Sequence, residues 1–223
     1  ASYRALMGGE ADLLLAAEPA QAIYEEKESS DFEWVMEPFA MDALVFVVNQ
    51  DNPVDSITTE QLQKIYTGEI TNWREVGGED QSIRPFQRAE DSGSQSALER
   101  LMAGLPLLEP EMEDRVASMG GIIQEVASYR NYKNAIGFSF RFYATEMVSS
   151  NDIRLLSLNG VAPTREAIRD GSYPLSSDFY AVTAAPIGQT PAQDQNPVLA
   201  EFLDWILSEE GQWLVEKTGY VSR

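Results

Sequence analysis

The sequence has 223 residues, of which 43% are hydrophobic and 23% charged, a composition that excludes extensive disorder and fits one large α/β domain or two smaller lobes. Its 36 acidic and 16 basic residues give a formal net charge of −20, so the surface repels nucleic acids and anionic membranes. The sequence contains neither Cys nor His, which excludes disulfides, thiol nucleophiles, Ser-His-Asp triads and the usual zinc sites. We therefore expect no nucleic-acid partner, no metal site and no cofactor.

The first residues predict a helix followed by a strand. Tyr3, Leu6 and Met7 repeat at helical spacing, and residues 12–17 have the pattern of a strand buried on both faces. An α/β chain that opens within a helix suggests that an earlier strand has been removed. The first residues lack the basic and apolar regions of an export signal, and no apolar run reaches the roughly 18 residues of a membrane helix.

Capping and proline signals define the next elements. Residues 42–48 predict a second buried strand. Thr58 and Gln61 have capping-box spacing and begin a helix whose apolar stripe ends at Gly68. Residues 83–86 predict a short strand, which Pro85 restricts to an edge or irregular position because proline donates no ladder hydrogen bond.

The remaining chain continues to alternate helices and strands. A helix follows Ser92 and ends near Gly104. Further predicted elements are a helix at 122–129, strands at 135–140, 153–158 and 175–183, a loop at 186–197 and one long final helix introduced by Asn196. This alternation predicts the α/β class with mostly parallel pairing.

One segment carries candidate binding chemistry, because its polar residues precede an amphipathic helix. A helix N-terminus exposes N–H groups and carries about half a positive charge, and glycine lets an oxyanion approach the backbone closely. Ser92 and Ser94 can donate hydroxyl hydrogen bonds on either side of Gly93, and Arg88 offers a guanidinium that suits phosphate. The segment therefore predicts an anion site.

Glu90 indicates which anion this site would select. A carboxylate beside a bound dianion is repulsive unless the ligand brings a proton for the carboxylate to accept. Monohydrogen phosphate carries such a proton and sulfate does not, so Glu90 would discriminate against sulfate by remaining an unpaired acceptor. A simpler interpretation stays open, in which Ser92 is only a helix cap and Arg88 and Glu90 form a solvated surface pair.

The segment Arg-x-Glu-x-Ser-Gly-Ser, residues 88–94, resembles the Arg-x-Asp-x-Ser-Gly-Thr phosphate-binding signature of the solute-binding proteins of bacterial ABC phosphate transporters. Further segments are similar to that family in order and spacing: residues 42–49, 57–68, 70–73 and 135–138. The resemblance covers nearly the whole chain. It implies an α/β fold of the type II periplasmic-binding-protein class, with two lobes of mostly parallel sheets, crossing hinge strands and a ligand held between the lobes.

The resemblance also implies lobe boundaries and a ligand set. Lobe one would comprise residues 1–47 plus 178–223 and lobe two residues 48–177, with hinge strands at 43–48 and 179–183. The phosphate-binding residues carried over to lobe two are Arg88, Glu90, Ser92, Gly93 and Ser94.

Lobe one departs from the family pattern. The family strand that resembles residues 12–19 often has an acidic contact residue near its end, where this sequence has Ala17, with Glu18 one residue later. A shift by one residue on a strand turns a side chain to the opposite face, so Glu18 can substitute only if the strand has already ended. The family's first strand, with its Gly/Ser/Thr-rich anion loop, has no counterpart in the sequence.

The resemblance implies binding without covalent chemistry. The protein would capture inorganic phosphate, or a similar small oxyanion, by lobe closure and deliver it to an ABC permease in the membrane. It would be a monomer outside the cytoplasm, in the periplasm or at the cell surface, and a lipid anchor in a segment absent from the sequence is left open. The alternative is a sensor or surface interaction module on the same scaffold, with altered or lost ligand binding, which Ala16 and Ala17 favour because they offer no polar donors.

An enzyme is the third class considered, and we expect no enzymatic activity. The acidic runs at 25–28 and 109–114 are typical of solvated faces in so acidic a chain, and they lack the spacing of a calcium loop. The tryptophans could line a sugar site, but their apolar surroundings favour core positions for Trp34, Trp73, Trp205 and Trp213.

Overall fold

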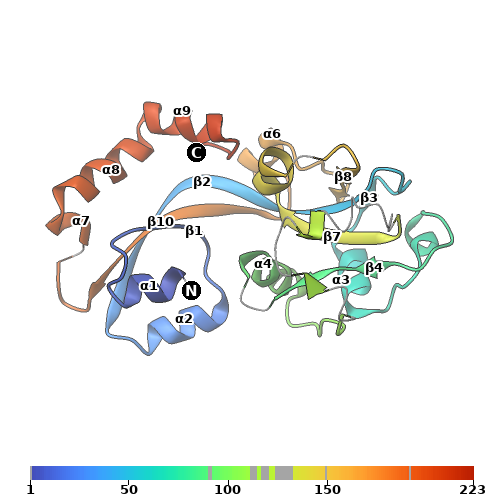
Figure 1. Ribbon diagram of the computed structural model, residues 1–223, viewed down its shortest axis with the longest axis horizontal. Helices are drawn as coiled ribbons and strands as arrows, with labels where there is room; N and C mark the ends of the chain where they lie inside the picture. Colours follow the sequence, from blue (N-terminus) through green and yellow to red (C-terminus); the bar gives the residue numbers. More distant parts are fainter. Residues whose placement is uncertain are drawn as a thin grey trace. The chain divides into compact units, whose positions relative to one another are not determined.

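The computed structural model describes residues 2–89, 92–110, 115–116, 121–123, 133–148, 150–190 and 192–223. The chain forms two compact units (Figure 1): unit 1 combines Ala1–Asp42 with Ser177–Arg223, and unit 2 is Ala43–Ser176. The chain passes between the units inside two long strands, β2 (Phe32–Asn49) and β10 (Ser176–Pro186).

Unit 1 is built on the first part of β2 and most of β10. Strand β1 (Leu14–Ala17) pairs antiparallel with β10, with Leu14 opposite Val182, and the sheet order continues from β10 to β2. The helices of this unit are α1 (Ser2–Met7), α2 (Gln21–Glu28), α7 (Ala192–Gln195), α8 (Pro197–Leu207) and α9 (Glu209–Thr218).

Alternating side chains of the unit 1 strands enter two separate apolar clusters. Ala181 packs with Ile206 of α8 and Val215 of α9, whereas the next residue, Val182, packs with Tyr3 and Leu6 of α1. Successive strand residues point to opposite faces of a sheet. The sheet of unit 1 is therefore covered by α8 and α9 on one face and by the N-terminal helix on the other (Figure 1).

Unit 2 contains shorter elements around a buried pair of strands. Its strands are β3 (Ser56–Ile57), β4 (Arg84–Pro85), β5 (Gln87–Arg88), β6 (Arg115–Val116), β7 (Ala135–Phe140), β8 (Ile153–Leu155) and β9 (Ser157–Leu158). Its helices are α3 (Thr59–Thr67), η1 (Trp73–Val76), α4 (Gly93–Met102), η3 (Tyr143–Met147) and α6 (Arg165–Arg169).

The core of unit 2 explains why two segments have continuous apolar sequence. Every residue of β7, and every residue of β2 from Ala43 to Asn49, is buried. Both faces of these strands are therefore covered. On one of them the rings of Phe46, Phe138 and Tyr66 form a triangle with centroid separations of 6.0–6.2 Å, which anchors α3 on the sheet.

The capping box predicted at Thr58 is confirmed. The Thr58 hydroxyl accepts from the Gln61 N–H at 3.0 Å, and the Gln61 side chain accepts from the Thr58 N–H at 2.9 Å. The helix ends at Gly68, whose φ of 83° lies in the left-handed region that glycine adopts without strain. These signals involve only neighbouring residues, so the sequence alone places α3 correctly.

The expectation of mostly parallel pairing is wrong, although the α/β class is confirmed. In the main sheet β1–β10, β2–β7 and β2–β8 pair antiparallel, and β4–β7 pairs parallel. Parallel neighbours arise when one crossover helix joins consecutive strands. Strands β7 and β8 instead follow β2 after a long stretch of chain, which leaves their direction free.

Several element predictions need correction. The predicted strand at 12–17 is shorter and is not buried on both faces, because Leu15 is 46% exposed. The strand predicted at 153–158 is divided into β8 and β9, and the 186–197 loop contains α7. Helix α2 was not predicted because it buries no residue and so has no apolar stripe. The 122–129 helix falls largely outside the described residues.

The long final helix is also two helices, α8 and α9, which are separated at Ser208. Trp73 is buried at 1% exposure as expected, whereas Trp213 of α9 is 60% exposed and is not a core residue. Within the part of the chain that the structure describes, each helix is too short or too polar to cross a lipid bilayer.

Candidate anion-binding site

The segment that carries the predicted phosphate-binding residues lies in unit 2, between β5 and α4. Arg88 is the last residue of β5, Ser92 is the N-cap of α4, and Gly93 and Ser94 are the first residues of that helix. Glu90 lies outside the described residues. The structure therefore brings together Arg88 and the first turn of α4, as the sequence motif implies.

Ser92 caps the helix. Its backbone is extended, with φ −87° and ψ 139°, and its hydroxyl oxygen accepts from the Gln95 N–H at 3.2 Å. Its carbonyl accepts the first helical hydrogen bond from the Ser96 N–H at 3.0 Å. Ser92 is thus a helix cap, as the simpler interpretation of the motif expects. Capping does not exclude ligand binding, because a hydroxyl that accepts one hydrogen bond still has a proton to donate.

Arg88 and Ser94 are joined directly. The Arg88 Nη1 donates to the Ser94 Oγ at 3.1 Å, and Ser94 is only 1% exposed. Since the guanidinium can only donate, it occupies a lone pair of the hydroxyl and directs the Ser94 proton elsewhere. Arg88 is itself half-buried, so it is not a fully solvated surface charge. The pair combines a cation with a hydroxyl whose proton this contact does not use.

The helix end itself is favourable for an anion. The N–H groups of Gly93 and Ser94 belong to the first helical turn, where no preceding helical carbonyl can accept from them. The helix has no acidic residue in its first turn and Arg100 in its last, so nothing in α4 offsets the partial positive charge of its N-terminus. Gly93 is exposed at this end.

Packing does not require glycine at position 93. Gly93 has no positive φ, and a Cβ added there would lie 3.9 Å from Cε2 of Phe140, an ordinary van der Waals contact. Packing against the described residues therefore does not explain the absence of a side chain at this exposed turn. Close approach of a ligand to the backbone is the other usual reason for glycine.

Two buried glutamines next to the motif were not identified from the sequence. Gln87 is 4% exposed and Gln95 is 3% exposed, and the Gln95 Oε1 accepts from the Arg88 N–H at 2.9 Å. A sequence signal did exist, because Gln95 lies three and seven residues before Leu98 and Met102, on the apolar stripe of α4.

In unit 1, strand β1 ends between the two positions that could carry the family's acidic contact residue, Ala17 and Glu18. Strand β1 ends at Ala17, so Glu18 follows the strand and is not bound by its alternation. The Tyr3 hydroxyl donates to the Ala17 carbonyl at 2.7 Å, and the Tyr24 hydroxyl donates to Glu18 Oε1 at 3.4 Å. Burial raises the pKa of Tyr3, which keeps its hydroxyl protonated as a donor.

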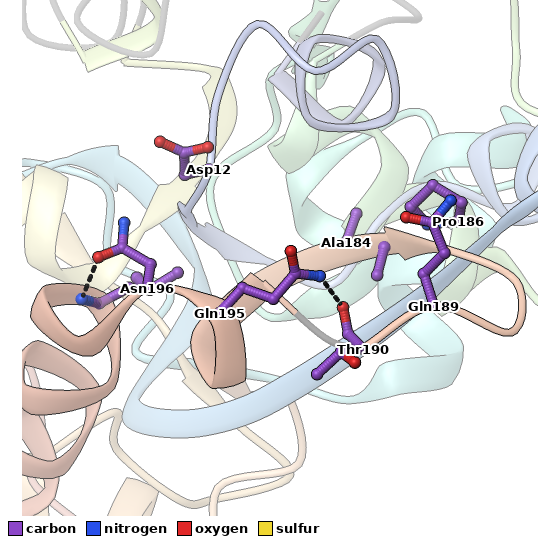
Figure 2. Close-up of a pocket in the computed structure, with 9 residues that line it drawn as sticks. Asp12, Ala184, Pro186, Gln189, Thr190, Gln195 and Asn196 are labelled. Carbon is purple, nitrogen blue, oxygen red and sulfur yellow. Dashed lines mark hydrogen bonds between the residues drawn. The ribbon is translucent and has the colours of Figure 1, made fainter.

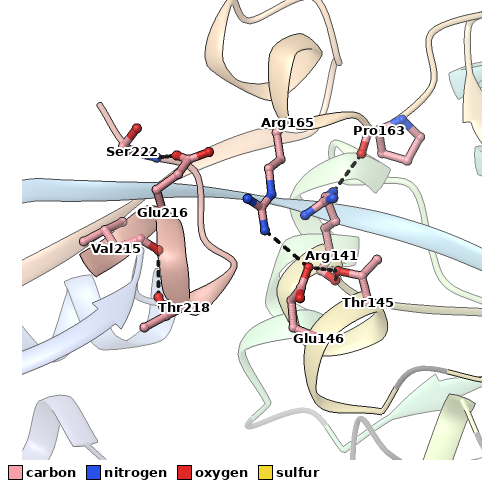
Figure 3. A network of polar contacts seen from close by, with 9 residues as sticks. All are labelled: Arg141, Thr145, Glu146, Pro163, Arg165, Val215, Glu216, Thr218 and Ser222. Carbon is pink, nitrogen blue, oxygen red and sulfur yellow. Dashed lines mark hydrogen bonds and ion pairs between the residues drawn. The ribbon is translucent and has the colours of Figure 1, made fainter. Parts of the chain in front are cut away.

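Two of the cavities in the described part of the chain are large enough to compare with the motif, and both lie away from it. One, of about 290 Å³, is in unit 1 and is lined by residues of β10, α7 and α8 together with Asp12 (Figure 2). The other, of about 460 Å³, is in unit 2 beside Arg141 and Arg165. There Arg141 Nε donates to the Pro163 carbonyl at 2.9 Å, and Arg165 lies 3.4 Å from Glu146 (Figure 3). Neither cavity is lined by Arg88 or the serines of the motif.

A model of the family described as PBP superfamily domain matches residues 1–210. The chain belongs to the PBP superfamily. Within it, the phosphate-binding protein PstS of Borreliella burgdorferi is 30% identical over 189 residues, which cover 82% of this chain and 64% of that protein. The phosphate-binding protein PstS of Bacillus subtilis is 29% identical over 200 residues, which cover 88% of this chain and 61% of that protein. The chain thus spans less than two thirds of the length of these relatives.

Solved structures agree with the membership in the PBP superfamily. A putative phosphate ABC transporter substrate-binding protein with bound phosphate from Clostridium perfringens has a TM-score of 0.77 at 28% identity, covering 100% of this chain and 83% of that one. An ABC-type phosphate transport receptor from Vibrio cholerae has a TM-score of 0.74 at 26% identity, covering 99% and 84%. The resemblance stated from the sequence, and the periplasmic-binding-protein fold it implies, are confirmed.

Proposed function

We propose that this chain is the phosphate-binding part of an extracytoplasmic solute-binding protein, which captures inorganic phosphate and delivers it to an ABC permease. The observation that carries the proposal is the 3.1 Å hydrogen bond from Arg88 to Ser94 at the N-terminus of α4, because it places a cation and a hydroxyl beside the N–H groups of the first helical turn. Relatives named phosphate-binding protein PstS support it.

The binding chemistry needs no covalent step. Arg88 balances charge, the N–H groups of Gly93 and Ser94 and the hydroxyls of Ser92 and Ser94 donate to phosphate oxygens, and the ligand leaves unchanged. Glu90 accepts the proton of monohydrogen phosphate in this proposal, as inferred from the sequence motif. We assign the chain no catalytic activity.

The two units are proposed to act as the two lobes of the binding protein. The boundaries inferred from the resemblance, 1–47 plus 178–223 for lobe one and 48–177 for lobe two, belong to this proposal, with β2 and β10 as the strands that bend during closure. We further propose that the protein is a monomer that works in the periplasm or at the cell surface.

Calorimetry with inorganic phosphate on the full-length protein tests the ligand. We expect Arg88→Ala to weaken binding by about 30-fold or more, since removing one partner of a buried charged hydrogen bond costs about 2–5 kcal/mol. Arg100→Ala is the matched control, because it removes the same charge from the far end of α4 and should bind as the unmodified protein does. No heat and no thermal stabilisation in millimolar phosphate would overturn the proposal.

Discrimination between phosphate and sulfate tests the role of Glu90. Glu90→Gln replaces the proton acceptor with a group that can also donate, so sulfate affinity should rise relative to phosphate affinity. Competition calorimetry with both anions measures the ratio. A ratio equal to that of the unmodified protein would remove Glu90 from the ligand set.

A sensor or surface interaction module on the same scaffold is the second candidate function. Ala16 and Ala17 favour it, since the end of β1 offers only backbone groups to a ligand. A folded protein that binds neither phosphate nor sulfate would support this candidate over transport.

A further inference from the structure

Two glutamine side chains flank the candidate site from inside unit 2. Gln87 immediately precedes Arg88 in β5, and Gln95 immediately follows Ser94 in α4. Each is less than 5% exposed. Glutamine is mostly found on protein surfaces, and burying its amide without hydrogen-bond partners costs about 1–3 kcal/mol. Both amides are therefore expected to have specific partners.

The partners form one continuous chain of hydrogen bonds. The Arg88 N–H donates to Gln95 Oε1 at 2.9 Å, and Gln95 Nε2 donates to Gln87 Oε1 at 3.3 Å. Gln87 Nε2 donates to the Leu108 carbonyl at 2.7 Å, and the Leu108 N–H donates to the Tyr66 carbonyl at 2.8 Å. This hydrogen-bonded series thus runs from the backbone N–H of Arg88 to the carbonyl of Tyr66 in the last turn of α3.

The groups at the two ends of this hydrogen-bonded series fix which atom of each amide donates and which accepts. At one end the Arg88 N–H can only donate, so Gln95 must present its oxygen there. At the other end the Leu108 carbonyl can only accept, so Gln87 must present its nitrogen. Every amide therefore points the same way, and aligned amides polarise one another and strengthen the series.

We propose that Gln95 and Gln87 are positioning residues that set phosphate affinity by holding the backbone of Arg88 in register with the first turn of α4. The inference rests on the proposed function. Neither glutamine touches the ligand in this arrangement. They fix the strand that carries the guanidinium relative to the helix that carries the serines, so the donors are in place before phosphate arrives.

Methionine substitutions test the role, because methionine fills a similar volume without hydrogen bonding. Gln95→Met should weaken phosphate binding about tenfold or more, the size of the loss seen when residues that hold metal ligands in place are removed. The matched control is Gln63→Met: Gln63 Nε2 donates to the Leu101 carbonyl at 2.8 Å, which ties α3 to the opposite end of α4. The control should lose less stability, because it removes one part-buried hydrogen bond whereas Gln95→Met removes two hydrogen bonds, one of them buried, and it should keep its affinity within about twofold.

A pH profile separates positioning from a general loss of structure. In Gln95→Glu the new carboxyl group, when protonated, can accept from the Arg88 N–H and donate to Gln87 as the amide does. When ionised, the carboxylate has no proton to donate, so one of its oxygens faces Gln87 Oε1 and two acceptors oppose each other. The affinity of this variant relative to the unmodified protein should therefore be lowest near pH 8 and recover as the pH falls, while the ratio for Gln95→Met stays constant.

A ligand-free measurement keeps this inference separate from the proposed function. Amide hydrogen exchange at Arg88, followed by NMR, should accelerate about tenfold or more in Gln95→Met and remain unchanged in Gln63→Met. Unchanged exchange would overturn the hydrogen-bonded series, whatever the ligand. Phosphate binding by the unmodified protein together with equal affinity in Gln95→Met would overturn the positioning role alone. Absence of phosphate binding in the unmodified protein would overturn the proposed function and, with it, the affinity role.

Discussion

The hydroxyls of Ser92 and Ser94 differ in the hydrogen bonds that they already make. Ser92 accepts from the helix backbone and Ser94 accepts from the Arg88 guanidinium, at 3.2 and 3.1 Å. Neither of these hydrogen bonds uses the serine's own proton, which suits a ligand made of acceptor oxygens. Monohydrogen phosphate has several such oxygens and a single proton, so it needs a site with many donors and one acceptor.

Gly93→Ala tests whether an oxyanion approaches the backbone at this turn. The added Cβ would lie 3.9 Å from Phe140, and alanine is the best helix former, so the free energy of unfolding should stay within about 0.5 kcal/mol of the original or rise. Phosphate affinity should nevertheless fall about tenfold, because a methyl group keeps the ligand away from the N–H groups. Urea denaturation and calorimetry measure the two quantities, and unchanged affinity would remove Gly93 from the ligand set.

The residues proposed to bind the ligand are identified by a local sequence motif, whereas the buried side chains that support them are not. Arg88, Ser92, Gly93 and Ser94 lie within seven residues of chain, so a local motif identifies them. Gln87 and Gln95 belong to a hydrogen-bonded series that continues to Leu108 and Tyr66, which are distant in sequence. A polar residue on an apolar helix stripe signals a buried partner but does not say which one.

Elements were predictable where their signals are local. Capping at Thr58 and termination at Gly68 depend on neighbouring residues, and α3 was placed correctly. Strand directions depend on contacts between distant segments, and the expected parallel pairing was wrong. The break between α8 and α9 has a local signal that the continuing apolar pattern obscures: Ser208 caps a helix with Glu209 and Glu210 in its first turn.

Gly211→Ala tests the corner between α8 and α9. A Cβ at Gly211 would overlap the Trp205 carbonyl oxygen and lie 2.6 Å from Cα of Ile206, and backbone atoms cannot move away as a flexible side chain can. We expect a loss of at least about 2 kcal/mol in the free energy of unfolding. Gly93→Ala, with ordinary space for its Cβ, is the control in thermal and urea denaturation. Equal stability of the two variants would show that the corner relaxes.

At the scale of the whole molecule, an acidic protein is proposed to bind an anion. The formal net charge is −20, yet Arg88 and the N-terminus of α4 provide positive charge at contact distance. Interactions between exposed charges are screened beyond about 10 Å at 0.1 M salt, so distant carboxylates affect the encounter more than the bound state. Affinity is then set by local donors, and the rate of association by the overall charge.

The association rate of phosphate should therefore rise with ionic strength, opposite to the behaviour of a steered encounter between unlike charges. Raising potassium chloride from about 10 to about 200 mM shortens the screening length from about 30 Å to below 10 Å, which should increase the association rate several-fold and leave dissociation nearly constant. Stopped-flow tryptophan fluorescence, or rapid-mixing calorimetry if the signal is small, measures both rates. Potassium gluconate in place of chloride controls for competition by a small anion. An association rate that falls with salt would mean that the local positive field of α4 and Arg88 governs the encounter.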